Sequence, residues 1–189
     1  RRANSVCLCR PAQKTNFEMT CSKVDQEGHI LMNDAEMSQY IQKLEGVDVV
    51  VNEFGSFFFY NPDPNVPPDH RFPFATLLTN DLNDQFSDLN RPSVFRLNIG
   101  IGKESFRSRF GVFKPPSGKD SAPESENEDS SYDFKALDQL MPHPVYGQMY
   151  WVCVLNPSDE TFETQVRPLL MEAYETAVSK YDKQAARRK

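Results

Sequence analysis

The clearest pattern of hydrophobic and polar positions lies in NDAEMSQYIQKLEG, residues 33–46. One helix face carries apolar side chains at the i, i+3, i+4, i+7 spacing, namely Met37, Tyr40, Ile41 and Leu44. Asn33 followed three residues later by glutamate is a capping-box signature, and Gly46 is the residue type that ends helices. The pattern predicts an amphipathic helix with one stripe facing a core.

Further along the chain, several stretches alternate or concentrate β-favouring residues as strands do. They cover residues 47–51, 56–60, 74–79, 94–101 and 148–155. The short connection 52–55 indicates a hairpin between the first two. Along VFRLNIGI, residues 94–101, the large apolar side chains from Phe95 onwards occupy every second position. Arg96 and Asn98 therefore share the opposite face of this strand.

Three other segments are predicted to be helical. Residues 103–111 and residues 133–141 (DFKALDQLM) each predict a short helix. The last helix starts near Ser158 and carries a long apolar stripe towards the C-terminal end. Pro168 lies too deep in this stripe to be a first-turn proline, so we expect a kink, or a short helix followed by a longer one.

This order of elements is typical of an α+β fold, a two-layer sandwich in which an antiparallel sheet of about five strands has helices on one face. Residues 1–32 lack an apolar period and are predicted to be a flexible tail. Residues 33–189 are predicted to form a single α+β domain. The segment 114–131 inside it is rich in Pro, Ser and Glu, and it is predicted to be a disordered insert.

Charge and cysteine content narrow the classes of protein. The formal net charge of −6 disfavours binding to a phosphate backbone, so we expect no nucleic acid partner. No apolar run approaches the roughly 20 residues of a membrane helix, so we expect a soluble, cytoplasmic protein without a membrane partner. The four cysteines lack the paired spacing of a zinc site. They are predicted to be reduced, with Cys153 buried in a strand, and metal binding by Cys7, Cys9 and Cys21 is the lesser alternative.

Two segments have features of ligand-binding loops but lack the full motif. GIGKES, residues 100–105, has Gly, Lys and Ser before a helix but not the complete phosphate-loop spacing. The acidic loop 80–91 lacks the glycine and the terminal glutamate of a calcium loop, and aspartates of this kind ordinarily cap turns. Asp88 and Arg91 in it are spaced for a local ion pair. We therefore expect no cofactor and no metal.

Arg96 and Asn98 raise a question about the strand face that they share. If the rest of the chain covers this face, Arg96 needs an ion-pair partner and Asn98 needs hydrogen bonds, because unpaired burial is costly. Antiparallel sheets commonly keep one face in contact with solvent. The sequence therefore favours an exposed sheet surface over a polar pocket.

His143 lies between two prolines in LMPHPVYGQMYW, residues 140–151. A residue before proline is restricted to extended conformations, and such restraint suits a binding or proton-transfer group. The alternative, which the sequence favours, is a rigid corner in which His143 caps the carbonyls of the helix predicted to end near Leu140. No Ser or Cys nucleophile motif accompanies the histidine.

Two segments, SDLNRPSVFRLNIG (residues 87–100) and LMPHPVYGQMYW (residues 140–151), resemble the uncharacterised proteins of domain-of-unknown-function family 6194. The resemblance runs from the first predicted helix to the last and omits residues 1–32 and the insert. It implies no known reaction. The end of the chain, WVCVLNP followed by a helix with MEAYETAV, is similar to small double-wing domains of the YjbR type.

Two functions from different classes fit these observations. The first, which the sequence favours, is a small binding module for a ligand or a protein partner, either monomeric or a weak homodimer. Its pocket would be lined by Arg91, Arg96, Asn98, His143, Tyr146 and Trp151. The second is an enzyme in which His143 is the general acid or base and Arg91 or Arg96 holds an anion. An enzyme requires His143 to reach a second polar group in a concave site.

Overall fold

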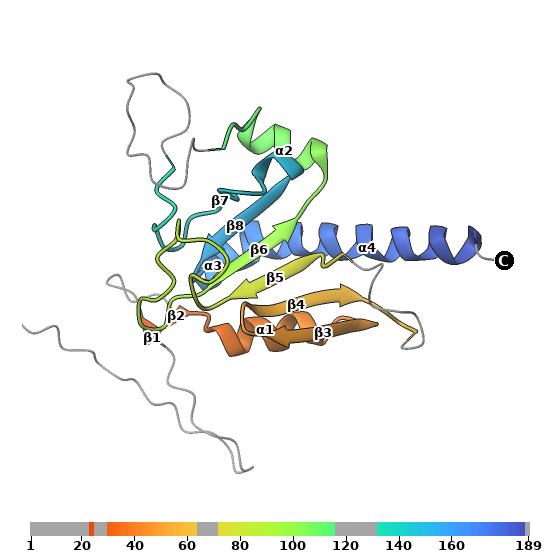
Figure 1. The fold of residues 1–189 in the computed structure, drawn as a ribbon, viewed down its shortest axis with the longest axis horizontal. Helices are drawn as coiled ribbons and strands as arrows, with labels where there is room; N and C mark the ends of the chain where they lie inside the picture. Colours follow the sequence, from red (N-terminus) through yellow and green to blue (C-terminus); the bar gives the residue numbers. More distant parts are fainter. Residues whose placement is uncertain (1–22, 25–29, 64–71, 116–131, 188–189) are drawn as a thin grey trace, which may run out of the picture.

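The computed structural model describes residues 23–24, 30–63, 72–115 and 132–187 (Figure 1). An open antiparallel sheet organises them, with six strands in the order β3-β4-β5-β6-β8-β7. These strands are β3 (Val47–Asn52), β4 (Gly55–Tyr60), β5 (Ala75–Leu78), β6 (Arg96–Gly100), β8 (Trp151–Leu155) and β7 (Met141–Pro142). The predicted α+β class is confirmed, and the sheet has one strand more than expected.

The first helix, α1 (Asp34–Gln42), begins with the predicted capping box. Asn33 Oδ1 accepts a hydrogen bond from the Glu36 amide at 2.9 Å, and the Asn33 amide donates to Glu36 Oε2 at 3.0 Å. The two residues thus satisfy each other's backbone donors at the helix start. The helix ends before Gly46, which takes a φ of +68° in the turn that leads into β3.

A hydrophobic core fills the space between the sheet and the helices α1 and α4 (Arg167–Arg187) (Figure 1). Alternate residues of the strands point into it, among them Phe58, Leu97, Ile99, Val152 and Val154. The helices contribute side chains at helical spacing, among them Met37, Ile41, Val166, Leu170 and Ala173. The alternation predicted for β6 is therefore confirmed, because its apolar residues face the core and Arg96 faces away.

The C-terminal helix is interrupted just before Pro168, as the sequence predicts. α3 (Asp159–Thr161) has Ser158 as its N-cap, and the Ser158 hydroxyl accepts from the Thr161 amide at 3.1 Å. A π-turn, η3 (Phe162–Val166), then leads into α4. Proline has no amide to donate four residues back, and its ring clashes with that carbonyl in a regular helix. The wider π-turn accommodates the ring.

The helix predicted for residues 133–141 is wrong, whereas α2 (Lys103–Phe110) is confirmed. The backbone carbonyl of Asp133 accepts from the Ala136 amide, and its side-chain Oδ1 accepts from the Lys135 amide, both at 3.0 Å. These two bonds fold the chain into a turn. Asp138 then takes a positive φ of 59°, which a helix does not allow. The segment ends in β7, which pairs with β8.

The second face of the sheet, which the sequence predicted to contact solvent, is covered over β6 and β8. The segment 80–95 and, from residues 132–146, the parts on either side of β7 lie over it, and we call 80–95 and 132–146 the two covering segments. They enclose a second apolar cluster with the sheet, made of Leu78, Leu89, Val94, Met141, Cys153 and Leu155. Cys153 is a free, buried thiol, as predicted.

Parts of the chain with predicted tail and insert character are only partly described. Within residues 1–32, β1 (Lys23–Val24) pairs with β2 (Ile30–Leu31). The described part of the chain does not include residues 1–22 and 25–29, nor residues 116–131 of the predicted insert. Among the helices that the structure does describe, none has both the length and the apolar character needed to cross a bilayer.

Candidate functional site

Arg96 is the centre of a buried polar cluster beneath the two covering segments. Its side chain is 0% exposed and forms a bidentate ion pair with Asp84, with Nη1–Oδ1 at 3.0 Å and Nη2–Oδ2 at 2.5 Å. Nη1 also donates to Ser87 Oγ at 2.8 Å. β6 presents the guanidinium on the second face of the sheet, and the first covering segment supplies both partners. The requirement that a covered Arg96 be paired is therefore met.

Asp84 is held in its charged form by this arrangement. Burial alone raises the pKa of its carboxyl, but the hydrogen bonds and the charge of Arg96, together with the Phe86 amide, outweigh burial and lower it. The Phe86 amide donates to Asp84 Oδ1 at 3.3 Å, which closes a turn of the kind predicted for aspartates in this loop. One carboxylate therefore shapes the covering segment and neutralises the buried guanidinium.

His143 joins the cluster from the second covering segment, and its side chain serves as an acceptor. Nδ1 accepts from the amides of Val145 and Tyr146, both at 3.1 Å. Backbone amides only donate, so Nδ1 carries no proton and the neutral ring is protonated on Nε2. The rigid corner is present, but the sequence-based role is wrong. His143 caps amides of a turn, and the described residues 132–146 contain no helix end whose carbonyls it could cap.

Neither ring nitrogen of His143 is available as a base in this arrangement. Burial, followed by the charge of Arg96, lowers its pKa to about 3, and Asp84 opposes this only in part. Nε2 lies 3.5 Å from Arg96 Nη2, where two donors face each other. The nearby Cys153 is no better suited as a nucleophile, because burial raises the pKa of its thiol to about 12.

The other predicted site residues have separate roles. Arg91 donates to the carbonyls of Ser87, Asp88 and Lys135 at 2.9–3.0 Å, so it ties the two covering segments together. It also forms the predicted local ion pair with Asp88, at 3.8 Å.

Asn98 and Tyr146 flank the cluster without completing a cavity. Asn98 Nδ2 donates to Thr76 Oγ1 at 2.9 Å, whereas Asn98 Oδ1 and Arg96 Nε are buried and have no hydrogen-bond partner among the described residues. Tyr146 is partly exposed, with its ring centroid 4.9 Å from that of His143. The structure thus brings Arg96, His143 and Tyr146 together, but closes Arg96 and His143 off from solvent.

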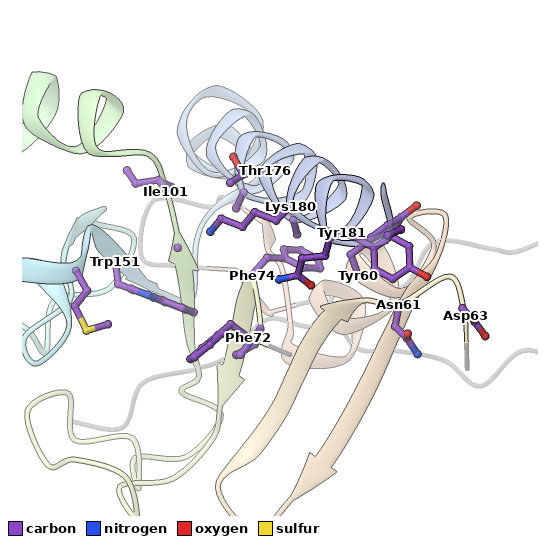
Figure 2. Close-up of a pocket in the computed structure, with 17 residues that line it drawn as sticks. Tyr60, Asn61, Asp63, Phe72, Phe74, Ile101, Trp151, Thr176, Lys180 and Tyr181 are labelled. Atoms are coloured by element: carbon purple, nitrogen blue, oxygen red, sulfur yellow. The ribbon is translucent and has the colours of Figure 1, made fainter. Parts of the chain in front are cut away.

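Trp151 belongs to a different place, an open groove at the Gly100 end of β6 (Figure 2). The groove has a volume of about 510 Å³ and lies between α4 and the strand ends at this side of the sheet. Aromatic and apolar side chains dominate its walls, among them Tyr60, Phe72, Phe74, Ile101, Met149 and Trp151. Figure 2 shows Lys180 reaching from α4 towards the Trp151 side.

Small residues keep the groove open. A Cβ at Gly100 would lie 3.1 Å from the Trp151 ring, so the absence of a side chain lets the indole lie against the strand. On the α4 wall, Ala173 and Ala177 are small side chains of this kind. Phe72 is 91% exposed at the rim. These features leave apolar surface uncovered on both sides of the groove.

Lys180 is the cation of this groove. It is exposed, and within the described part of the chain it forms no ion pair or hydrogen bond. Sequence reasoning missed both Lys180 and Phe72. The available signal was the position of Lys180, which extends the apolar stripe of α4 three residues beyond Ala177. No comparable signal exists for Phe72, because it follows a proline-rich loop.

The described residues contain no group of three or more His, Cys, Asp or Glu side chains placed to hold a metal ion. Cys7, Cys9 and Cys21, the lesser metal-binding alternative, lie outside the described residues.

Comparison with known proteins gives a family but no closer relative. No curated protein and no solved structure matches the chain, so the similarity to YjbR-type domains stays a prediction. A family model matches residues 32–186, which include both covering segments, the buried cluster and the groove. Arg96 and His143 come from the two segments on which the resemblance rests. With this match over most of its length, the chain belongs to the Family of unknown function (DUF6194).

Proposed function

We propose that the protein is a binding module for a small molecule with a planar apolar ring and an acidic group, and that the ligand binds in the groove beside α4. The observation that carries the proposal is a groove in which the exposed Phe72 and the partly exposed Trp151 lie with Lys180, a lysine that has no partner among the described residues. Small-molecule sites are concave and mostly apolar, with a few polar groups that fix orientation. A groove of about 510 Å³ is in the size range of such sites.

The ring of the ligand packs against Trp151 and Phe72. Both side chains present apolar surface to solvent in the free protein, and covering it gives the main favourable term of binding. A planar ring suits this place because the Trp151 indole lies flat against Gly100 and offers one face. The offset stacking of two rings adds about 0.5–1.5 kcal/mol beyond the buried area.

The acidic group of the ligand pairs with Lys180. An ammonium group at the edge of an apolar groove orients the ligand. The ring can pack on Trp151 while the anion meets Lys180 only if the anion points to α4. Asn61 and Asp63 line the opposite side of the groove (Figure 2). The carboxylate of Asp63 disfavours an anion there, so the two sides differ in the charge that they accept.

The groove beside α4 is not the pocket that the sequence predicted at Arg96 and His143. These side chains are 0% and 1% exposed, so a ligand would reach them only after both covering segments moved away. Their partners are within the chain, which supports a role in holding the covering segments on the sheet. Trp151 alone of the six predicted ligand-binding residues lines the groove.

The test is a thermal-shift and calorimetric measurement with 2-naphthoate and indole-3-carboxylate, each paired with its neutral amide. We expect the acids to raise the melting temperature and the amides to do so less. Lys180→Ala should weaken binding of the acids by about five- to tenfold, roughly 1 kcal/mol, without changing that of the amides. Lys183→Ala is the matched control on the same helix, because Lys183 is exposed and does not line the groove.

Trp151→Leu separates the ring contact from the charge. It should weaken acids and amides alike, because both lose the surface on which the ring packs. Absence of any shift at millimolar concentrations of all four compounds would contradict the proposal. So would binding that neither the Lys180 nor the Trp151 variant affects.

A further inference from the structure

The two edges of the sheet differ in how they are protected. β7 is an edge of two residues, and one of these is Pro142, which has no amide to offer a further strand. β3 forms the other edge with six residues, VDVVVN, without proline and with three consecutive valines. Among the described residues β3 pairs only with β4. An unpaired edge of this length is a template for another strand.

The pairing of β3 with β4 fixes which backbone groups point outwards. Asn52 and Gly55 close the two-residue hairpin loop. In such a hairpin the closing pair is hydrogen-bonded, so each of the two amides donates to the carbonyl of the other residue. Bonded pairs recur at every second residue, and the bond from the Asn61 amide to the Gly46 carbonyl, 2.7 Å, continues this series. The amides and carbonyls of Val49 and Val51 therefore point away from β4.

We propose that β3 pairs antiparallel with β3 of a second copy of this chain, across a two-fold axis at Val50. In this register Val49 lies opposite Val51 of the second copy, so all the outward groups of both residues are bonded. Val50 lies opposite its own counterpart in the closely spaced position, where side chains contact most. The two sheets then continue as one.

Side-chain chemistry selects this register. Asp48 lies opposite Asn52 of the second copy, so a carboxylate meets an amide and like charges do not face each other. Shifting the axis to Val49 places Asp48 opposite Val50 of the second copy. It also places the Val51 carbonyl opposite the Val47 amide, which already donates to the Leu44 carbonyl at 3.3 Å. That shifted register therefore loses bonds and opposes a charge to an apolar residue.

A second copy also explains the exposed valines. Val50 is 45% exposed and Val51 is 70% exposed, and successive residues of a strand point to opposite faces. Edge pairing places a neighbouring strand beside both side chains, so apolar surface is covered on each face of the joined sheet.

Val51→Pro is the decisive variant, because it removes an outward amide and leaves the bonds between β3 and β4 in place. Sedimentation velocity of the full chain over a range of concentrations should show a dimer for the wild type. Val51→Pro should weaken the association by about tenfold or more, because each copy loses one interstrand bond. Unchanged far-ultraviolet circular dichroism and melting temperature verify that the monomer remains folded.

A second variant tests the position of the axis. Val50→Lys places two like charges directly opposite each other and should also give a monomer. Val145→Lys is the matched control, because Val145 is 43% exposed but lies in a covering segment, and this variant should still dimerise.

Amide exchange gives the residue-level measurement. Protection of the Val49 and Val51 amides should rise with protein concentration, whereas that of Val50 should not change. A wild-type chain that stays monomeric up to millimolar concentration would overturn the proposal. So would a dimer that survives both Val51→Pro and Val50→Lys, or one whose concentration-dependent protection lies outside β3.

Discussion

Lowering the pH should destabilise the fold through His143, and the structure gives the size and the direction of the effect. The pKa of His143 is lowered from 6.5 to about 3 in the folded chain, by burial and then by Arg96. Above pH 6.5 the ring is neutral in both folded and unfolded chains, so its contribution to stability is fully present. Below pH 6.5 the unfolded chain takes up a proton that the folded chain excludes, and stability is lost.

The magnitude follows from the two pKa values. Each pH unit between them costs at most about 1.4 kcal/mol of unfolding free energy, and the loss between pH 7 and pH 5 is about 2 kcal/mol. Asp84 contributes outside this window. Its pKa is lowered below 3.8, so its contribution is present above that value and is lost only as the pH falls further. The range from pH 7 to pH 5 therefore isolates the histidine from the carboxylate.

Urea unfolding of the wild type and of His143→Asn at pH 7, 6 and 5 is the assay. Asparagine does not titrate, and its side-chain oxygen can still accept from the Val145 or Tyr146 amide. We expect the wild type to lose about 2 kcal/mol more than this variant between pH 7 and pH 5. Equal losses would show that the folded ring titrates normally, and the account of a neutral, buried acceptor would then be refuted.

His143→Leu complements this comparison at pH 7. Leucine fills the space but accepts no hydrogen bond, so two partly buried amides lose their partner. This variant should be less stable than His143→Asn by about 1–3 kcal/mol, the cost of leaving such groups unsatisfied. Equal stability of the two variants at pH 7 would mean that the contacts of Nδ1 contribute nothing.

Other predictions concern the ion pair, the chain segments and nucleic acid. Arg96→Met should destabilise the fold by about 3–5 kcal/mol because it leaves Asp84 buried without its counter-charge, and adding Asp84→Leu should restore much of the loss in chemical denaturation. Residues 1–32 and 114–131 should be cleaved first in limited proteolysis and should be dispensable for folding, whereas protection of 117–131 would contradict this. A mobility-shift assay at low salt should show no strong complex with DNA or RNA, and a salt-sensitive complex that survives removal of residues 187–189 would overturn that expectation.

Local pattern predicted most of the elements because their causes are local. The capping box at Asn33 and Glu36 involves two residues three apart, and the alternation along β6 needs only the two-residue period of a strand. The interruption near Pro168 follows from the missing amide of proline alone. The failed helix at 133–141 had a weaker cause, a few apolar residues at helical spacing. Asp133 provided a stronger local turn, and Asp138 takes a positive φ while it bonds to Leu155 and Ser158.

The burial of the polar cluster could not be predicted from pattern. The two covering segments have no hydrophobic period, so nothing in them indicates that they cross the sheet. The sequence did establish a condition, namely that Arg96 would need a partner if its face were covered. It could not identify which of several aspartates in the loop that partner is. Asp81 and Asp84 look alike in sequence, yet Asp81 accepts from the amides of Leu89 and Asn90.

His143 shows a similar limit. Its two flanking prolines correctly predicted a rigid corner, because they restrict the backbone directly. Whether the ring donates or accepts depends on which backbone groups surround it. The predicted helix would have offered carbonyls, but the observed turn offers amides, which reversed the role of the side chain.

The second face of β6 relates the closed cluster to the open groove. Arg96, Asn98 and Gly100 follow one another along this face, and their side chains decrease from a guanidinium to an amide to none. A buried guanidinium is tolerable only beneath a segment that brings a carboxylate and a hydroxyl, so the Arg96 end has to be covered. At Gly100 there is no group that requires a partner, and the space is taken by the face of Trp151. The same strand therefore closes one end of the sheet surface through its polar side chain. At its other end Gly100 and Trp151 line the groove that Lys180 borders from α4, which is why a ligand site is to be sought there.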